Sequence, residues 1–163
     1  MSNKKFELTT NTKVFLGKKL FQIKALVSFG NVEAGDLGGY VEKEENLSHE
    51  GDAWVYGDAW VYGNAKVYGN AEVYGNAEVY GNAEVCGNAE VYGNADYATI
   101  KGFGTCCRTT TFFRQKDGRV GVKCGCFYGD LNEFREQVRK TREGKIAEEY
   151  LMIADLMEKH FEE

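Results

Sequence analysis

Residues 51–98 read GDAWVY, GDAWVY, GNAKVY, GNAEVY, GNAEVY, GNAEVC, GNAEVY, GNADYA, eight consecutive hexads with almost no change of register. Because six is even, the Ala and Val of each hexad lie on one face of an extended chain, and Glu and Tyr lie on the other. Gly followed by Asn or Asp tolerates left-handed backbone angles and marks a corner. The repeat therefore predicts short strands separated by corners and stacked along one axis.

Two degraded hexads precede this array, at residues 39–44 and 45–50, and they place Val41 and Leu47 where the later hexads have alanine. The array resembles the hexapeptide-repeat family, in which a small residue precedes an aliphatic residue by two positions. The resemblance implies a left-handed parallel β-helix of about three coils, with three hexads in each coil. The inward positions would be held by seven valines: Val55, Val61, Val67, Val73, Val79, Val85 and Val91.

The segments on either side have a different pattern, so we divide the chain into residues 1–38, 39–104 and 105–163. Residues 14–29 are apolar and β-prone around Gly17, which predicts a hairpin that caps the first coil. Residues 105–114 and 119–128 flank Asp117-Gly118, a strong two-residue hairpin signal. The predicted fold is thus mainly β: a β-helix with an N-terminal β cap and a C-terminal hairpin joined to two helices.

The two C-terminal helices are predicted from capping and from apolar spacing. Asp130 followed by Glu133 is typical of a helix start, and Leu131, Phe134 and Val138 would form the buried stripe. Gly144 ends this pattern. In the second helix the buried stripe would be formed by Ile146, Tyr150, Ile153 and Met157.

Composition narrows the functional classes. The 163 residues carry a net charge of −5 and are 43% hydrophobic, as in a soluble globular protein. No stretch approaches the roughly 20 apolar residues of a membrane span, and the first residues lack a signal-peptide pattern. Five cysteines without such a signal predict a reduced, cytoplasmic setting. Direct nucleic-acid binding and membrane association are therefore not expected.

Residues 35–55 (GDLGGYVEKEENLSHEGDAWV) and 125–138 (GCFYGDLNEFREQV), taken with the hexads, resemble a group of phage and prophage proteins. Those proteins join a hexad array to a small C-terminal module. The resemblance implies a virus-encoded accessory protein that acts in the cytoplasm of a bacterial host.

An enzymatic role finds little support among the histidines and cysteines. The chain has only His49 and His160, and we expect a capping or buried role for the first and a solvated position for the second. Cys106-Cys107 and Cys124-x-Cys126 invite a zinc site. Folding the hairpin at Asp117-Gly118 pairs Lys116 with Arg119 and Thr111 with Cys124. Cys106 then points away from Cys107, Cys124 and Cys126, which favours core cysteines instead of a zinc site. No catalytic residue, metal or cofactor is predicted.

The other face of this hairpin is predicted to bind an anion. Residues 101–126 contain six basic residues and one acidic residue, a local charge of +5. Arginine forks and hydroxyls bind phosphate, and aromatic rings stack on bases. The alternative is an ordinary solvated strand face, or a face that docks on the acidic array. The candidate ligand residues are Arg108, Thr110, Phe112, Arg114, Lys123 and Phe127.

The outer surface of the array is the third candidate site. Positions eighteen residues apart would stack, so Tyr56, Tyr74 and Tyr92 form one column, the predicted contact of a homo-oligomer, with a trimer favoured. Residues 39–98 contain eleven acidic and two basic residues, a net −9. Simple solubility, or tyrosine columns that stabilise the stack, explains the same pattern.

These observations favour a non-enzymatic binding protein that sequesters a phosphate-bearing small molecule, such as a nucleotide signal of a host defence system. Two alternatives stay open. An acidic decoy could bind a host protein by imitating the charge of DNA, and a hexapeptide-type acyltransferase could use His49 as a general base.

Overall fold

The hexads form strands of only two residues each in the computed structural model, which describes residues 4–162. Each of the first four hexad strands pairs in parallel with the strand eighteen residues later, so that Val73 lies between Val55 and Val91. The corners need glycine: at Gly51, where φ is +70°, an added Cβ would lie 2.4 Å from the carbonyl oxygen of Gly69. The strands are β4 (Trp54–Val55), β5 (Trp60–Val61), β6 (Lys66–Val67), β7 (Glu72–Val73), β8 (Glu78–Val79), β9 (Glu84–Val85) and β10 (Glu90–Val91). We call residues 39–98 the hexad stack.

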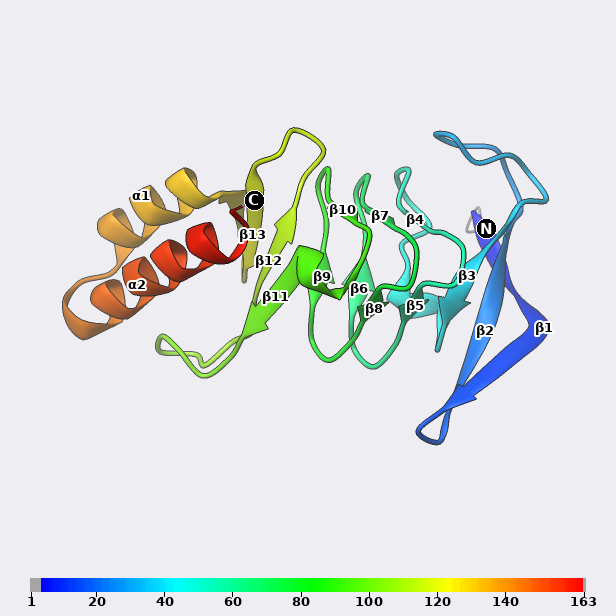
Figure 1. Cartoon of the computed structure of the whole chain (residues 1–163), viewed down its shortest axis with the longest axis horizontal. Coiled ribbons are helices and arrows are strands. Elements are labelled where there is room, and N and C mark those ends of the chain that lie inside the picture. The colour runs from blue at the N-terminus through cyan, green and yellow to red at the C-terminus, as the bar shows by residue number, and fades with distance from the viewer. Residues whose placement is uncertain (1–3, 163) are drawn as a thin grey trace.

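The predicted regular left-handed parallel β-helix is wrong. The short strands are divided among a five-stranded mixed sheet (β1-β2-β3-β5-β8), a three-stranded parallel sheet (β10-β7-β4) and a two-stranded parallel sheet (β6-β9). Only two of every six residues are in a strand, so no parallel ladder between hexad strands is wider than two residues. One ladder also continues into long antiparallel strands, so the architecture is a set of small mixed sheets (Figure 1).

The two degraded hexads enter the stack with a different offset from the one the sequence suggested. Val41 pairs with Val61 and Leu47 with Val67, a spacing of twenty residues, so both occupy valine positions rather than alanine positions. The backbone of Gly39 passes so close to the next ladder that a Cβ there would lie 2.5 Å from the oxygen of Ala59. This glycine therefore provides close packing and not a hexad corner.

The interior of the stack is apolar, as predicted for the valines: each of the seven has no exposed surface. The alanine two positions before each valine is also fully buried or nearly so. Backbone hydrogen bonds connect neighbouring strands within each ladder, such as the bond from Glu72 N–H to Ala89 O at 2.9 Å. Each ladder therefore buries its side chains and satisfies its backbone polar groups together.

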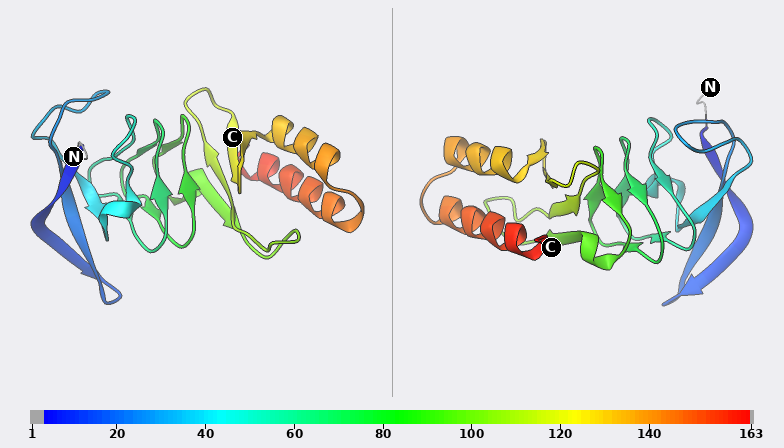
Figure 2. Two further views of the ribbon diagram at one scale, coloured as in Figure 1. Left: turned by 180° about the vertical axis from the view of Figure 1, so that it is seen from behind. Right: turned by 45° about the horizontal axis from the view of Figure 1, so that its top comes forward.

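An antiparallel hairpin lies at the N-terminal end of the stack, formed by β1 (Phe6–Phe15) and β2 (Lys18–Ala25). It begins earlier than the predicted residue 14 and turns at Leu16-Gly17, both with positive φ. Strand β3 (Leu37–Val41) pairs with β2 on one side and with β5 on the other. The hairpin is thus continuous with the stack (Figure 2).

The C-terminal sheet has four antiparallel strands, not the two of the predicted hairpin. The strands are β11 (Tyr97–Ile100), β12 (Thr110–Arg114), β13 (Val120–Cys124) and β14 (Phe127–Asp130), in that order. The predicted register is wrong by one residue, because Thr111 pairs with Lys123 and not with Cys124. The turn runs from Gln115 to Arg119, with Gly118 at φ +84°, and this extra residue reverses the faces of β13.

The two faces of this sheet cover different parts of the molecule. Phe113 packs into the core of the hexad stack, and the Thr111 hydroxyl accepts a hydrogen bond of 3.0 Å from Glu84 N–H. Phe112 packs on the other face with the helices. The sheet therefore closes the end of the stack and carries the helices on its outer side (Figure 2).

The helices are α1 (Leu131–Thr141) and α2 (Gly144–His160), and short 3₁₀ turns occur at Glu44–Asn46 and Asn94–Asp96. The predicted cap is confirmed, since Asp130 Oδ1 accepts a 2.8 Å hydrogen bond from Glu133 N–H. The predicted buried stripes are confirmed for Leu131, Phe134, Val138, Tyr150, Ile153 and Met157, whereas Ile146 is half-buried. Among residues 4–162, no helix is long and apolar enough to cross a membrane.

A buried lysine joins the hairpin to the stack. Lys5 is 3% exposed, and its Nζ donates to Ala53 O at 2.6 Å and to Gly51 O at 3.3 Å. The same Nζ lies 4.6 Å from the centre of the Phe29 ring. Burial lowers the pKa of Lys5 to about 8, partly opposed by the charge of Asp52.

We expect Val73→Asp to destabilise the stack by about 3–5 kcal/mol, because it buries a carboxylate without a partner. Asn76→Asp adds the same charge at an exposed corner of the next hexad and should change stability by less than about 0.5 kcal/mol. Urea unfolding of both variants measures the difference, and equal stabilities would contradict the buried position of Val73.

Lys5 should make stability depend on pH. Between pH 8 and the ordinary lysine value of 10.5, the unfolded chain holds a proton that the folded chain has lost, so stability rises with pH in this window. Between pH 8 and pH 10, the free energy of unfolding of the parent should rise by about 1–3 kcal/mol relative to that of Lys5→Met. Denaturant unfolding at several pH values measures this, and parallel curves for the two proteins would rule out the lowered pKa.

Candidate functional site

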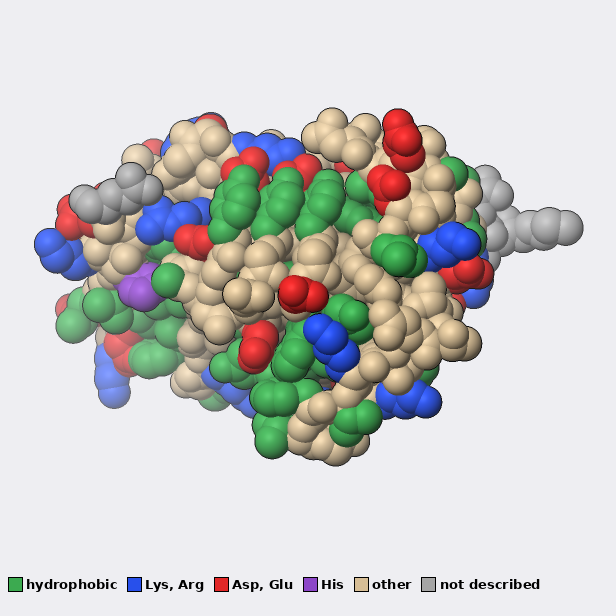
Figure 3. All heavy atoms as spheres, turned by 45° about the vertical axis from the view of Figure 1, so that its right-hand side comes forward, with side chains coloured by type: hydrophobic (Ala, Val, Ile, Leu, Met, Phe, Trp, Pro, Cys, Tyr) green, Lys and Arg blue, Asp and Glu red, His purple; other side chains and the backbone are tan. Residues whose placement is uncertain are grey.

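The predicted tyrosine columns are present on the surface of the hexad stack. The rings of Tyr56, Tyr74 and Tyr92 lie parallel, with centroids 4.5 and 4.6 Å apart. Hydrophobic side chains lie side by side in a row on this face (Figure 3). Tyr74 donates its hydroxyl to the Glu72 carboxylate, and burial together with this carboxylate raises the pKa of Tyr74 well above its ordinary value. The phenols of this column therefore stay neutral at physiological pH.

The acidic face of the stack is partly neutralised by the C-terminal sheet. Lys116 Nζ lies 3.2 Å from Glu72 Oε1, and Arg114 Nε lies 2.8 Å from Asp96 Oδ1. Two of the basic residues that give residues 101–126 their positive charge therefore bind the stack itself. Through these two residues the C-terminal sheet docks on the acidic stack, which is the alternative that the sequence left open.

The six predicted ligand residues do not gather on one face. Thr110 is buried and donates its hydroxyl to Cys124 Sγ at 3.2 Å, and Phe112 is fully buried. Arg114 also donates to the carbonyl of Phe161, and Lys123 donates to the carbonyl of Gly125. The one-residue register shift separates Lys123 from the others, because it reverses the faces of β13 relative to β12.

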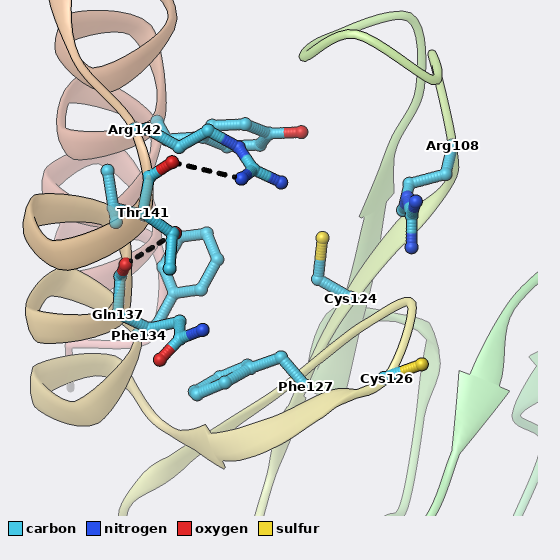
Figure 4. A pocket seen from close by; sticks show the side chains of 10 residues that line it. Arg108, Cys124, Cys126, Phe127, Phe134, Gln137, Thr141 and Arg142 are labelled. Atoms are coloured by element: carbon cyan, nitrogen blue, oxygen red, sulfur yellow. Dashed lines mark hydrogen bonds between the residues drawn. The ribbon is translucent and has the colours of Figure 1, made fainter.

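Arg108 and Phe127 are brought together, in a pocket of about 210 Å³ between the C-terminal sheet and the helices. The pocket lies where the β13–β14 turn meets the end of α1 and the middle of α2 (Figure 4). Its lining comes from the loop before β12, this turn and both helices: Arg108, Cys124, Cys126, Phe127, Phe134, Gln137, Val138, Thr141, Arg142 and Tyr150.

Aromatic rings form the inner wall of the pocket. The Phe134 ring lies 5.7 Å from Phe127 and 5.8 Å from Tyr150, in tilted and edge-to-face arrangements. The Tyr150 hydroxyl donates to Phe103 O at 3.2 Å, which attaches the loop before β12 to helix α2. Burial raises the pKa of Tyr150, so its hydroxyl stays protonated. This wall offers flat apolar surface with a fixed shape.

Two guanidinium groups stand at the opening. Arg142 extends from the end of α1 and Arg108 from the loop opposite, with Cys124 between them (Figure 4). Among residues 4–162, neither guanidinium has a carboxylate within ion-pair distance. Arg142 Nη1 donates to the neighbouring carbonyl of Thr141, at 3.2 Å. Arg108 packs over Gly125, where an added Cβ would lie 1.7 Å from its Nη1.

Arg142, Tyr150 and Gln137 were not among the predicted ligand residues. The sequence does contain a signal for Arg142, because Phe134, Val138 and Arg142 follow at intervals of four and thus share one helix face. The contribution of Gln137 and Tyr150 depends on how the helices pack on the sheet. No sequence pattern shows that arrangement.

The structure places two of the cysteines differently from the prediction. Cys106, Cys107 and Cys126 are exposed, so the prediction of core positions for Cys107 and Cys126 is wrong. The reason is that β12 begins only at Thr110 and Cys126 lies in a turn.

His49 has a structural role. Its ring stacks on that of Phe6, with centroids 4.2 Å apart, and it accepts a hydrogen bond from Lys5 N–H. Within residues 4–162, no three His, Cys, Asp or Glu side chains form a group suited to a metal ion.

Comparison with protein-family models and with curated proteins gave no match for this chain. The resemblance to hexapeptide-repeat and phage proteins therefore rests on the quoted segments alone.

A homotrimer formed through the tyrosine columns is still a prediction. Tyr80 and Tyr92 are 51% and 56% exposed, an aromatic display typical of an interface. Light scattering at tens of micromolar should then give three times the chain mass of 18.3 kDa, and Tyr92→Glu should lower it by placing like charges together. Leu16→Asn, at the exposed hairpin turn, is the control that keeps the mass. A parent mass near one chain would exclude the trimer.

Proposed function

We propose that this protein binds a small phosphate-bearing molecule, without catalysis, in the pocket between the C-terminal sheet and the helices. The observation that carries the proposal is the pair of guanidinium groups, Arg108 and Arg142, at the opening of an aromatic pocket. Arginine holds phosphate through two parallel hydrogen bonds, and each bond to a charged group contributes about 1.5–3 kcal/mol. Arg114, another basic side chain of the C-terminal sheet, instead pairs with Asp96 and contributes to holding the fold.

The size of the pocket limits the ligand. Its volume of about 210 Å³ is smaller than the roughly 300–1,000 Å³ of typical small-molecule pockets. It therefore accommodates a phosphate with a single flat ring system, such as that of a nucleoside monophosphate, and leaves part of the ligand in solvent. Phe127, Phe134 and Tyr150 would contact the ring, while Arg108 and Arg142 would hold the phosphate.

The acidic-decoy alternative has less support. Its basis is the net charge of −9 on residues 39–98, but Glu72 and Asp96 already pair with Lys116 and Arg114. The acyltransferase alternative needs a free histidine, whereas His49 is held by Phe6, Lys5 and Glu44. The proposal retains the setting predicted from the sequence, the cytoplasm of a bacterium in which a phage-encoded protein sequesters a nucleotide signal.

Calorimetry with adenosine monophosphate, phenyl phosphate and inorganic phosphate tests the proposal directly. We expect the two organic phosphates to bind more tightly than inorganic phosphate, because only they reach the aromatic wall. Adenosine without phosphate should bind weakly, and affinity for the phosphates should fall with added salt.

The two arginines are tested by Arg108→Gln and Arg142→Gln. Each should weaken binding of adenosine monophosphate by about tenfold to a hundredfold. Arg139→Gln is the matched control, since Arg139 is exposed on the same helix and does not line the pocket. The proposal fails if none of the three probes binds, or if both pocket variants bind as tightly as the control.

A further inference from the structure

Arg108 extends from a loop that has no regular structure of its own. Residues 101–109 form neither strand nor helix, and the Arg108 side chain is exposed. The hydrogen bond from the Tyr150 hydroxyl to Phe103 O attaches this loop to helix α2. The place of the guanidinium at the pocket opening therefore depends on what the loop and the side chain rest against.

The guanidinium rests on bare backbone at Gly125, in the turn between β13 and β14. A Cβ at Gly125 would overlap Arg108 Nη1 and would lie 2.9 Å from its Cζ. The turn has little freedom to move away. Cys124 pairs with Phe127 across it, and Lys123 Nζ donates a hydrogen bond to the glycine carbonyl. A side chain at this position would therefore displace the guanidinium rather than the turn.

A second glycine lets the loop approach helix α2. A Cβ at Gly104 would lie 2.5 Å from the Tyr150 hydroxyl oxygen and 3.3 Å from its Cζ. The Tyr150 ring is buried and packs edge-to-face on Phe134, so it has no room to give way. A side chain at Gly104 would therefore push the loop away from the helix and break the bond to Phe103 O.

We propose that Gly104 and Gly125 are positioning residues of the phosphate site. The inference rests on the proposed function, because it gives the two glycines the task of holding Arg108 opposite Arg142 (Figure 4). Gly104 fixes the loop on α2, and Gly125 fixes the guanidinium that the loop carries. A guanidinium held in place before the ligand arrives loses less conformational freedom on binding, so it holds phosphate more tightly.

Calorimetry with adenosine monophosphate measures the effect of Gly125. Gly125→Ala should weaken binding by about tenfold to a hundredfold, as Arg108→Gln does, because both remove the same group from the site. Gly118→Ala is the matched control. Gly118 is a turn glycine of the same sheet with φ +84°, and nothing lies within 4 Å of an added Cβ there. It carries similar backbone strain and should bind as the parent does.

The Gly104 contact has a matched pair within its own loop. Gly102 has φ +97° and Gly104 has φ +75°, but only at Gly104 would an added Cβ meet another group within 4 Å. Gly104→Ala should therefore weaken binding of adenosine monophosphate, and Gly102→Ala should not.

A double-mutant cycle separates positioning from general damage to the fold. In an Arg108→Ala background, Gly125→Ala should change the affinity by less than about twofold, since no guanidinium is left to displace. A loss as large as that in the parent background would contradict positioning. Gly125→Asn repeats the cycle with a residue that tolerates positive φ, which keeps the test decisive if the alanine variant does not fold.

Nuclear magnetic resonance of the arginine Nε–Hε groups tests the positioning without a ligand. The heteronuclear NOE should report a restrained Arg108 in the parent and in Gly118→Ala. In Gly125→Ala it should report a mobile group, like that of the exposed Arg139. Equal Arg108 values in Gly125→Ala and Gly118→Ala would overturn the inference, whether or not the nucleotide binds. If Arg108 becomes mobile in Gly125→Ala but the parent binds no nucleotide, the glycine does position Arg108 and the proposed ligand is wrong.

Discussion

The backbone ladder between positions eighteen residues apart is the constraint on which the molecule depends. Bonds such as the one from Glu72 N–H to Ala89 O hold the narrow strands in register, and only this register places every valine over a valine. Each ladder is two residues wide, too little to be stable alone. Burial of the alanines and valines between the ladders, together with glycine at the corners, provides the rest of the stability.

Such a stack has an unpaired end, and the C-terminal sheet closes it. Phe113 completes the apolar core and Thr111 accepts a hydrogen bond from the backbone of β9. Arg114 and Lys116 then pair with carboxylates of the stack, which fixes how the sheet sits on it. The opposite face of the sheet is left for the helices, and the pocket forms where this second layer meets the β13–β14 turn. The position of the pocket thus follows from how the stack ends.

Much of the fold could be predicted from the sequence, for reasons that are local. The inward valines followed from the even period, and the start of α1 followed from Asp130 and Glu133. The predicted strand register of the C-terminal hairpin failed, because a single extra turn residue changes it. A turn from Gln115 to Arg119, rather than a two-residue turn, reversed β13 and separated Lys123 from Phe112. The regular β-helix failed because the strands proved too short and joined separate sheets.

The candidate site was less accessible to prediction, because it is formed between layers. Arg108 and Phe127 were found from charge and aromatic content, and Arg142 could have been found from its spacing to Phe134 and Val138. Tyr150 enters the site only because α2 packs back on the sheet, attached through its hydroxyl to Phe103 O. Helix packing of this kind depends on the whole core and has no short sequence pattern.

The eighteen-residue spacing has a consequence for how the gene could change. Loss or gain of three hexads would return every later strand to the same ladder, with Val over Val and Tyr over Tyr. Loss of one hexad would instead move the C-terminal sheet to a different ladder, and Arg114 and Lys116 would meet different carboxylates. Length variants should therefore survive in steps of three hexads, each bringing the N-terminal hairpin and the pocket closer together or farther apart by one strand spacing.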